Sequence, residues 1–294
     1  MDCPIGFCIR TGMIKMLEAL QFEFMQNALM AGLLASLICG IMGTLVVVNR
    51  IVFLSGGIAH ASYGGIGLAF FFGWPYLFGT IGFALLMAFF MAAITLKAKH
   101  RSDTIIGVLW AVGMALGIIL IDLTPGYNVD LMSYLFGSIL TVPDSDIWLM
   151  LAVGAIIICV VSYFYNDYLA LSYDEEFAQI RGIHVKSLYF LLIALLAVSV
   201  VMIIRVVGLI LVIALLTIPP YIVEKYSKSL IKMMIFSSVM SAIFTFTGMW
   251  FSFIFNLTSG ASIILVAAFG FLISIAIERI IPKISKRTVK MVEK

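Results

Sequence analysis

Long apolar segments follow one another along almost the whole chain, separated by short polar connections. A helix needs about 20 apolar residues to cross the roughly 30 Å hydrocarbon core of a bilayer, and the chain contains nine segments of about this length. They cover residues 25–48, 54–72, 76–96, 104–121, 147–165, 188–204, 207–223, 231–255 and 261–281. The pattern predicts an all-α polytopic integral membrane protein with eight to nine transmembrane helices.

Composition agrees with this prediction and narrows the class of protein. Hydrophobic residues make up 63% of the 294 positions, charged residues make up 11%, and the mean hydropathy is +1.18. Soluble domains carry about a quarter charged residues, so a soluble fold is excluded. The net charge of +3 is too small to indicate a nucleic-acid partner.

The distribution of positive charges predicts the orientation of the chain. If the first crossing runs from outside to inside, all but three of the 18 Lys and Arg residues fall on the inner side. The exceptions are Arg10, Lys15 and Arg205. Inner loops of membrane proteins are enriched in these residues. We therefore expect an extracytoplasmic amino-terminal segment (1–24), a transmembrane domain (25–281) and a basic cytoplasmic tail (282–294) in a multi-pass protein of the cell membrane.

No segment of the chain fits a nucleotide-binding site. The dipeptide Gly-Lys, which the phosphate-binding loop of P-loop ATPases requires, does not occur. The polar connections are also too short to form a separate soluble domain. If transport is driven by ATP, the ATPase must be another polypeptide, and we expect this chain to carry out no covalent chemistry.

One of the three histidines lies inside the second apolar segment. The stretch SGGIAHASYGGIGLAF (55–70) places His60 about 15 Å along a helix from Arg50, near the middle of the membrane. Gly56 and Gly64 lie one turn before and after it, so the pattern predicts open space beside the imidazole. An ionisable group at this depth indicates function by default, and imidazole is a good ligand for zinc and similar ions. The alternative is a histidine that only hydrogen-bonds a carbonyl of the next helix.

A second row on the same predicted helix consists of small residues, namely Gly57, Ala61, Gly65 and Ala69. Residues four apart share one face of a helix, and rows of small residues let two membrane helices approach closely. We expect this row, together with the two glycines that flank His60, to provide the helix packing around the pathway.

The polar segment 166–187 mixes acidic and apolar residues in a helical pattern between two membrane spans. Its acidic residues include Asp174, Glu175 and Glu176. Glu176, Ala178 and Gly182 fit the pattern Glu-x-Ala-x-x-x-Gly. A short helix ended by glycine is suited to sit in a groove of a soluble partner. An amphipathic loop helix resting on the membrane surface is the alternative.

Four acidic residues lie in or beside the connection between the fourth and fifth apolar segments. They are Asp122, Asp130, Asp144 and Asp146. Together they predict a negatively charged outer vestibule that draws in a divalent cation. Solvated loop carboxylates, or contacts to a binding protein, are an equally good interpretation of each one.

Several of these segments together resemble the permease subunit of the ATP-binding-cassette importers for zinc and manganese. The similarity extends over about residues 43–276 and is specific in the order and spacing of its motifs. The motifs are GTLVVVNRIVFLSGGIAHASYGGIGLA, RSDTIIGVLWAVGMALGIIL, VDLMSYLFGSIL, the Glu-x-Ala-x-x-x-Gly loop, VVGLILVIALLTIPP and SGASIILV. VDLMSYLFGSIL is especially similar to the zinc-importing branch.

The resemblance implies the permease fold of this importer family and a homodimer that encloses the transport pathway. Two cytoplasmic ATPase subunits would bind ATP, and an extracytoplasmic metal-binding protein would deliver the ion. Zinc is the first candidate for that ion and manganese the second, and no cofactor is bound permanently. The segment around Asp174–His184 resembles the coupling helix that enters a groove of the ATPase.

One departure from the family pattern affects the candidate metal site at His60. Family members often carry an acidic residue four positions before the histidine, and here that position is Gly56. Ser55 and Ser62 are weak neutral ligands, so a second ligand comes from the dimer mate or from elsewhere, or the site is looser in this chain. The main alternative function is a secondary metal transporter driven by an ion gradient. That class predicts paired membrane-embedded carboxylates and inverted repeats, and the sequence shows neither.

Overall fold

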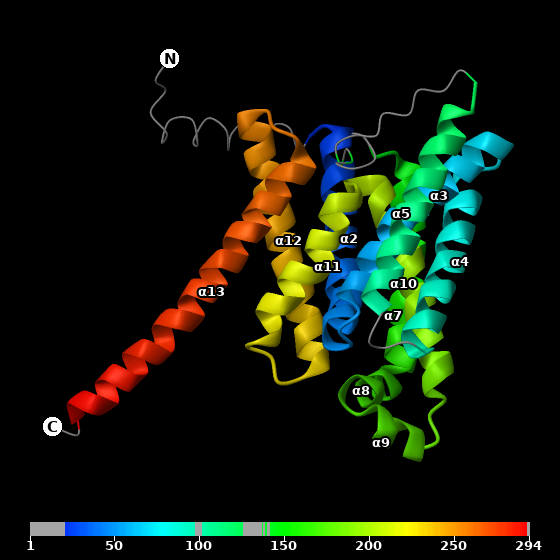
Figure 1. Cartoon of the computed structure of the whole chain (residues 1–294). Helices are drawn as coiled ribbons and strands as arrows, with labels where there is room; N and C mark the ends of the chain where they lie inside the picture. The colour runs from blue at the N-terminus through cyan, green and yellow to red at the C-terminus, as the bar shows by residue number, and fades with distance from the viewer. Residues whose placement is uncertain (1–20, 98–101, 126–136, 138, 140–141, 293–294) are drawn as a thin grey trace.

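The computed structural model describes residues 21–97, 102–125, 137, 139 and 142–292, with side chains up to residue 280 (Figure 1). Within these ranges the chain forms α-helices and no strands. The helices are α2 (Glu23–Val48), α3 (Val52–Phe72), α4 (Tyr76–Lys97), α5 (Ser102–Asp122), α7 (Asp144–Tyr163), α8 (Tyr165–Tyr173), α9 (Glu175–Ile180), α10 (Val185–Val207), α11 (Leu209–Glu224), α12 (Leu230–Phe255) and α13 (Ser259–Val292). The predicted all-helical fold class is confirmed.

Each of the nine apolar segments coincides with a helix. Among the described residues, seven helices are long and apolar enough to cross a membrane, namely α2, α4, α5, α7, α10, α12 and the first 22 residues of α13. The other two segments are α3, with 21 residues, and α11, with 16. Large apolar side chains are exposed on the outer helices, for example Trp148 at 70% and Leu265 at 69%. Such a surface suits contact with lipid rather than water.

The two ends of the helix bundle differ. Helices α8 and α9 lie together beyond one end, at the bottom of Figure 1. The turn between α2 and α3 and the last residues of α4 line a pocket with residues of α8 and α9, so they share this end. We call it the α9 end. The first residues of α2, α4 and α7 lie at the opposite end (Figure 1).

Helix α10 forms the centre of the bundle. It packs against α2, α3, α4, α7 and α11. Leu192, Leu196 and Val200 on this helix have no exposed surface. Because α10 contacts protein on nearly every side, its apolar residues build the core instead of facing lipid.

Helix α5 packs on α3 through glycine residues. A side-chain carbon at Gly113 would lie 2.9 Å from the Cα atom of Ala61, and one at Gly117 would lie 2.5 Å from the carbonyl oxygen of Tyr63. These glycines therefore bring the two backbones into direct contact, as small residues do in membrane helix pairs. The other face of α5 is exposed, with Val108 and Val112 more than half accessible.

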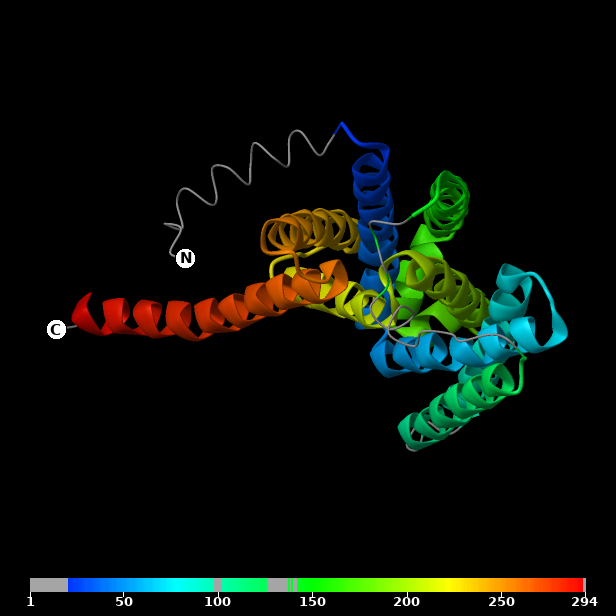
Figure 2. The same cartoon turned by 90° about the horizontal axis from the view of Figure 1, so that it is seen from above.

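Helices α2, α11, α12 and α13 form the other side of the bundle. Ser36 of α2 and Thr245 of α12 share a buried hydrogen bond of 3.1 Å. Helix α13 packs against α11 and α12 near its start and then leans away from the bundle (Figures 1 and 2). The segment from residue 282, expected as a basic tail, continues this helix to Val292.

Candidate functional site

The histidine that the sequence analysis identified, His60, lies near the middle of α3. His60 is partly buried, and its Nδ1 atom is buried with no hydrogen-bond partner among the described residues. The alternative role, a hydrogen bond from this nitrogen to a carbonyl of the next helix, is therefore not seen. An unpartnered buried imidazole nitrogen is costly, and metal coordination would satisfy it.

The imidazole of His60 lies flat against the indole of Trp110 on α5. The two ring centroids are 3.9 Å apart and the planes differ by 15°. The indole nitrogen of Trp110 points to Met114 one turn further along, with 3.2 Å between Nε1 and Sδ. One face of the histidine ring is thus covered by a second aromatic ring, which the sequence analysis did not anticipate.

The space expected on both sides of His60 is present on one side only. At Gly56 an added side-chain carbon would meet only the Cδ1 atom of Ile213, at 3.9 Å, which is ordinary contact. At Gly64 it would lie 2.6 Å from the ring of Phe83 and 2.8 Å from the carbonyl oxygen of Gly113. The prediction of open space is wrong at Gly64, because the absence of a side chain there is used for close helix packing. The room beside the imidazole is therefore toward the α9 end.

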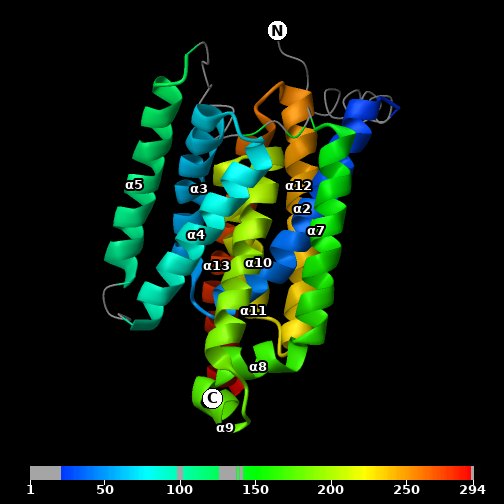
Figure 3. The same cartoon turned by 90° about the vertical axis from the view of Figure 1, so that its right-hand side faces the viewer.

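The row of small residues packs against both neighbouring helices. A side-chain carbon at Gly57 would lie 2.5 Å from Ile106 of α5, and one at Gly65 would lie 2.8 Å from the carbonyl oxygen of Gly79 on α4. Ala61 contacts Gly113, as described above. These residues hold α3 between α4 and α5 (Figure 3), and so fix the height and rotation of His60.

No acidic side chain completes a metal site within the described part of one chain. No group of three or more His, Cys, Asp or Glu residues there is placed to hold an ion. Ser55 donates a hydrogen bond to the carbonyl of Val52 at 2.7 Å, and Ser62 donates one to that of Ala59 at 2.6 Å. Among the described residues, no group of three or more ligands thus surrounds the His60 imidazole, and firm coordination of a divalent ion requires further ligands.

The segment expected to couple to an ATPase contains helix α9. Asp174 caps its first turn, because its Oδ1 atom accepts a hydrogen bond from the backbone nitrogen of Phe177 at 2.9 Å. At the other end Gly182 has a φ of +80°, and Ile183 donates a backbone hydrogen bond to Ala178 at 3.1 Å. This is the Schellman arrangement, in which glycine adopts a left-handed conformation. The short helix is thus defined at both ends by its own sequence.

Helix α9 is anchored on one side and exposed on the other. Ala178 is fully buried, whereas Phe177 is 50% exposed and Ile180 is 85% exposed. Glu175 and Glu176 of its first turn are exposed as well. The preceding helix is anchored by Tyr168, whose ring is buried, and this burial raises the pKa of its phenol. Helix α9 therefore packs on the protein through Ala178 and presents an apolar and charged surface on its other side.

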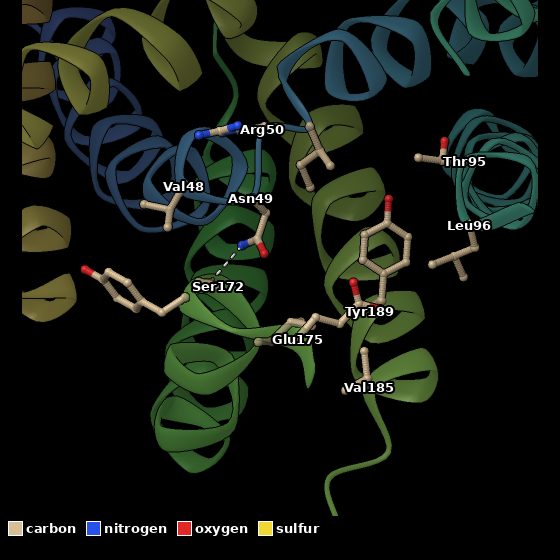
Figure 4. Close-up of a pocket in the computed structure, with 12 residues that line it drawn as sticks. Val48, Asn49, Arg50, Thr95, Leu96, Ser172, Glu175, Val185 and Tyr189 are labelled. Atoms are coloured by element: carbon tan, nitrogen blue, oxygen red, sulfur yellow. Dashed lines mark hydrogen bonds between the residues drawn. The ribbon is translucent and has the colours of Figure 1, made fainter. Parts of the chain in front are cut away.

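A pocket of about 460 Å³ lies between this segment and the turn that leads into α3 (Figure 4). Its lining includes Arg50 from the turn, Glu175 from α9 and Tyr189 from α10. The amide nitrogen of Asn49 donates a hydrogen bond of 3.0 Å to the hydroxyl of Ser172 across it. The pocket thus places the base of α9 next to the start of the helix that carries His60.

The acidic residues expected in an outer vestibule lie at the opposite end where they are described, and Asp130 lies outside the described residues. Asp122 is exposed at the end of α5. Asp144 accepts a hydrogen bond from Asn27 at 2.6 Å. Asp146 is buried, and its Oδ2 atom lies 2.9 Å from the Nε atom of Arg205 at the end of α10. Asp122 and Asp144 are thus both exposed at this end, whereas Asp146 is held in a buried ion pair and is not placed as a vestibule carboxylate would be.

The Asp146–Arg205 pair was missed by sequence reasoning, although an arginine in the last turn of an apolar helix is a signal for a buried partner. The guanidinium also lies over the ring of Tyr76, 5.6 Å from its centroid. The three residues join the ends of α4, α7 and α10. This cluster therefore fixes the bundle at the end opposite α9.

Replacing Arg205 with alanine is expected to lower the free energy of unfolding by about 2 kcal/mol, because it leaves the Asp146 carboxylate buried without a counter-charge. This is less than the roughly 3–5 kcal/mol of a fully buried pair, since the Arg205 side chain is 31% exposed. Thermal denaturation in detergent measures this as a lower midpoint. The double variant Arg205→Ala, Asp146→Asn should recover part of the loss, since it removes the unpaired charge. An unchanged midpoint in the single variant would contradict a stabilising role for the pair.

Comparisons with known proteins agree with the fold and with the sequence motifs. The profile of the ABC 3 transport family matches residues 21–278. An uncharacterized membrane protein of Synechocystis sp. is 50% identical over 90% of this chain and 94% of its own length. The manganese import system permease protein ScaB of Streptococcus gordonii is 34% identical over 86% of this chain and 91% of its own length.

A solved structure shares the fold over most of its length. PsaBC from Streptococcus pneumoniae, determined in complex with a Fab, superposes with a TM-score of 0.81 and 34% identity. The match covers 89% of this chain and 95% of that one. The resemblance stated from the motifs is confirmed: the chain belongs to the ABC 3 transport family and is a membrane permease subunit of an ABC-type metal transport system.

Proposed function

We propose that two copies of this chain form the membrane channel of an ATP-driven importer of divalent transition-metal ions. The observation that carries this proposal is His60, a partly buried imidazole with an unpartnered nitrogen, held in the bundle of an ABC-type permease. The ion passes this ring and is not stored there. A complete set of tetrahedral ligands at about 2.0 to 2.3 Å would trap zinc, so the incomplete site suits transport.

The second copy supplies what one chain lacks. A single imidazole does not hold a divalent ion firmly, and the described part of the chain contains no group of three or more His, Cys, Asp or Glu residues that could hold one. The exposed apolar face of α5 lies on the helix that also carries Trp110, beside His60. A second copy packed along the pathway would bring a second imidazole toward the ion.

The α9 end faces the cytoplasm in this proposal. The excess of Lys and Arg on that side supports the orientation, which places the amino terminus outside and the carboxyl terminus inside. The opposite end then receives the ion from an extracytoplasmic metal-binding protein. Asp122, and Asp130 beyond the described residues, would draw the cation toward that mouth.

Helix α9 is the contact to the cytoplasmic ATPase pair. Its capped ends make it rigid, and its exposed Phe177 and Ile180 are suited to a groove in a soluble partner. Glu175 and Glu176 give helix α9 its negative charge, and the conformation at Gly182 determines how it ends. ATP-driven closure of the partner would move α9 as a rigid body, and the Asn49–Ser172 hydrogen bond links its base to the turn before α3.

Manganese is the first candidate ion and zinc the second, which reverses the order expected from the sequence. A relative that matches nearly the whole chain is named for manganese import. Zinc stays the second candidate because the position four residues before His60 is a glycine, and a nitrogen ligand without a carboxylate suits zinc better than manganese.

Uptake of radioactive manganese and zinc into vesicles tests the proposal. This chain and its ATPase are reconstituted in the vesicle membrane with the ATPase on the inside. ATP is enclosed in the vesicles, and the metal-loaded binding protein is added outside. We expect manganese to accumulate and an excess of zinc to compete with it. If neither metal accumulates although the complex hydrolyses ATP, the proposed function is wrong.

A further inference from the structure

The stacking of Trp110 on His60 assigns a role to a residue that is not itself a metal ligand. Metal-binding histidines usually hold their orientation by donating the second ring N–H to a carboxylate or carbonyl. No hydrogen bond from the His60 ring to a carboxylate or carbonyl is seen among the described residues, and its Nδ1 atom is buried without a partner. The ring is instead held by its face, 3.9 Å from the indole centroid and nearly parallel to it.

Trp110 is itself fixed in place. Its indole nitrogen is directed to the sulfur of Met114, and the ring of Phe53 lies 6.3 Å away at a tilted angle. One turn along α5 the backbone at Gly113 touches α3 at Ala61. The backbone of α5 at Trp110 is therefore held close to α3, and the contacts with Met114 and Phe53 favour the orientation in which the indole lies on His60.

We propose that Trp110 is the positioning residue for His60, and that it orients the imidazole toward the open side at Gly56 and favours its metal-bound form. Coordination of a divalent ion withdraws electrons from the imidazole. A stacked electron-rich indole then stabilises the ring more than it does the free imidazole, in the manner of a cation–π interaction. This inference rests on the proposed function, because it takes the metal path past His60 as given.

If Trp110 only fills space in the helix packing, its removal has a different expected effect. Loss of the indole would then lower stability and the amount of folded protein, without changing the apparent affinity for the ion. A positioning role changes the affinity, and it does so only while His60 is present. The two roles are therefore separated by a kinetic measurement and by a variant that lacks the histidine.

The first experiment measures the apparent KM for manganese and zinc uptake in vesicles that contain the complex with its ATPase. Trp110→Ala should raise KM by about three- to tenfold, as expected for loss of an aromatic pair, with little change in the maximal rate per complex. Trp110→Phe should recover most of the affinity. The remote Trp250→Phe is the matched control. Adding Trp110→Ala to His60→Ala should have no further effect.

The second experiment needs no transport and so separates this inference from the proposed function. Binding of nickel, an ion that imidazole binds well, is measured by calorimetry in the ATPase complex with the wild-type chain, with Trp110→Ala and with His60→Ala. Trp110→Ala should weaken the His60-dependent binding by about three- to tenfold, and His60→Ala should abolish that binding.

The outcomes decide between the claims. If the wild-type complex imports metal but Trp110→Ala keeps the wild-type KM, the positioning role is overturned and the proposed function stands. Nickel binding that is as tight in Trp110→Ala as in the wild type also overturns the positioning role. Weaker nickel binding in Trp110→Ala, seen only while His60 is present, supports the positioning role even in a complex that imports neither metal.

Discussion

Replacing His60 with alanine is expected to reduce metal uptake at low ion concentration by at least about 10- to 100-fold, the affinity typically lost when only a residue that orients a metal ligand is replaced. The imidazole is the single strong ligand identified along α3, and its Nδ1 atom has no other partner among the described residues. Uptake of radioactive manganese into vesicles measures the effect. Co-purification with the ATPase should be unchanged, because His60 lies within the bundle and away from α9.

Ser199→Ala is a matched control for this variant. Ser199 is also buried within a membrane helix, and its hydroxyl donates a hydrogen bond to Leu195 of the same helix at 2.6 Å. It should transport at nearly the wild-type rate. Wild-type uptake by His60→Ala would remove the histidine from the pathway.

Replacing Gly182 with valine is expected to uncouple ATP hydrolysis from uptake. A left-handed backbone costs a residue with a side chain about 1–2 kcal/mol, and this strain opposes the Schellman end of α9. A side-chain carbon at this position would meet nothing within 4 Å, so the effect is on the backbone alone. Because 1.4 kcal/mol corresponds to a tenfold change in an equilibrium constant, the ratio of intact to frayed α9 should fall by about tenfold, and uptake per ATP should fall with it. The ratio of ion accumulated to phosphate released measures it.

Gly73→Val provides the matched control. Gly73 has a φ of +65° and open space around it, as Gly182 does, but it ends α3 at the opposite end of the bundle. The two substitutions carry the same backbone strain, so a general loss of stability would affect both alike. Equal coupling ratios in the two variants would show that α9 has no specific role.

The helices could be predicted well from the sequence, because a membrane span is a property of one continuous segment. The expected segments 104–121 and 188–204 appear as α5 and α10 with boundaries that differ by a few residues. Their length is set by the thickness of the bilayer. The position of α10 at the centre of the bundle was not predictable in the same way, since an apolar helix has a similar sequence whether it faces lipid or protein.

The candidate site could be predicted only in part. The depth of His60 follows from its position along one helix, but its surroundings depend on α4 and α5. A glycine beside a histidine permits either empty space or the close approach of a neighbour. Gly56 provides the first, whereas Gly64 allows Phe83 to approach, and the sequence does not distinguish these cases.

Contacts between side chains of different helices were also not predictable from the sequence. Trp110 meets His60 because Gly113 and Gly117 draw α5 onto α3. Arg205 was counted as a cation on the outer side, and the structure pairs it with the buried Asp146. Each contact joins two helices, so it depends on tertiary packing that no single segment determines.

The most direct test of the account is the energy source of transport. Uptake of radioactive manganese is measured in vesicles that hold this chain alone, or the chain with its ATPase, with ATP present and with no ion gradient. The account predicts accumulation only with the ATPase and hydrolysable ATP. A proton or sodium gradient is then imposed on the vesicles that hold the chain alone; accumulation under this gradient would contradict the account and would identify a secondary transporter.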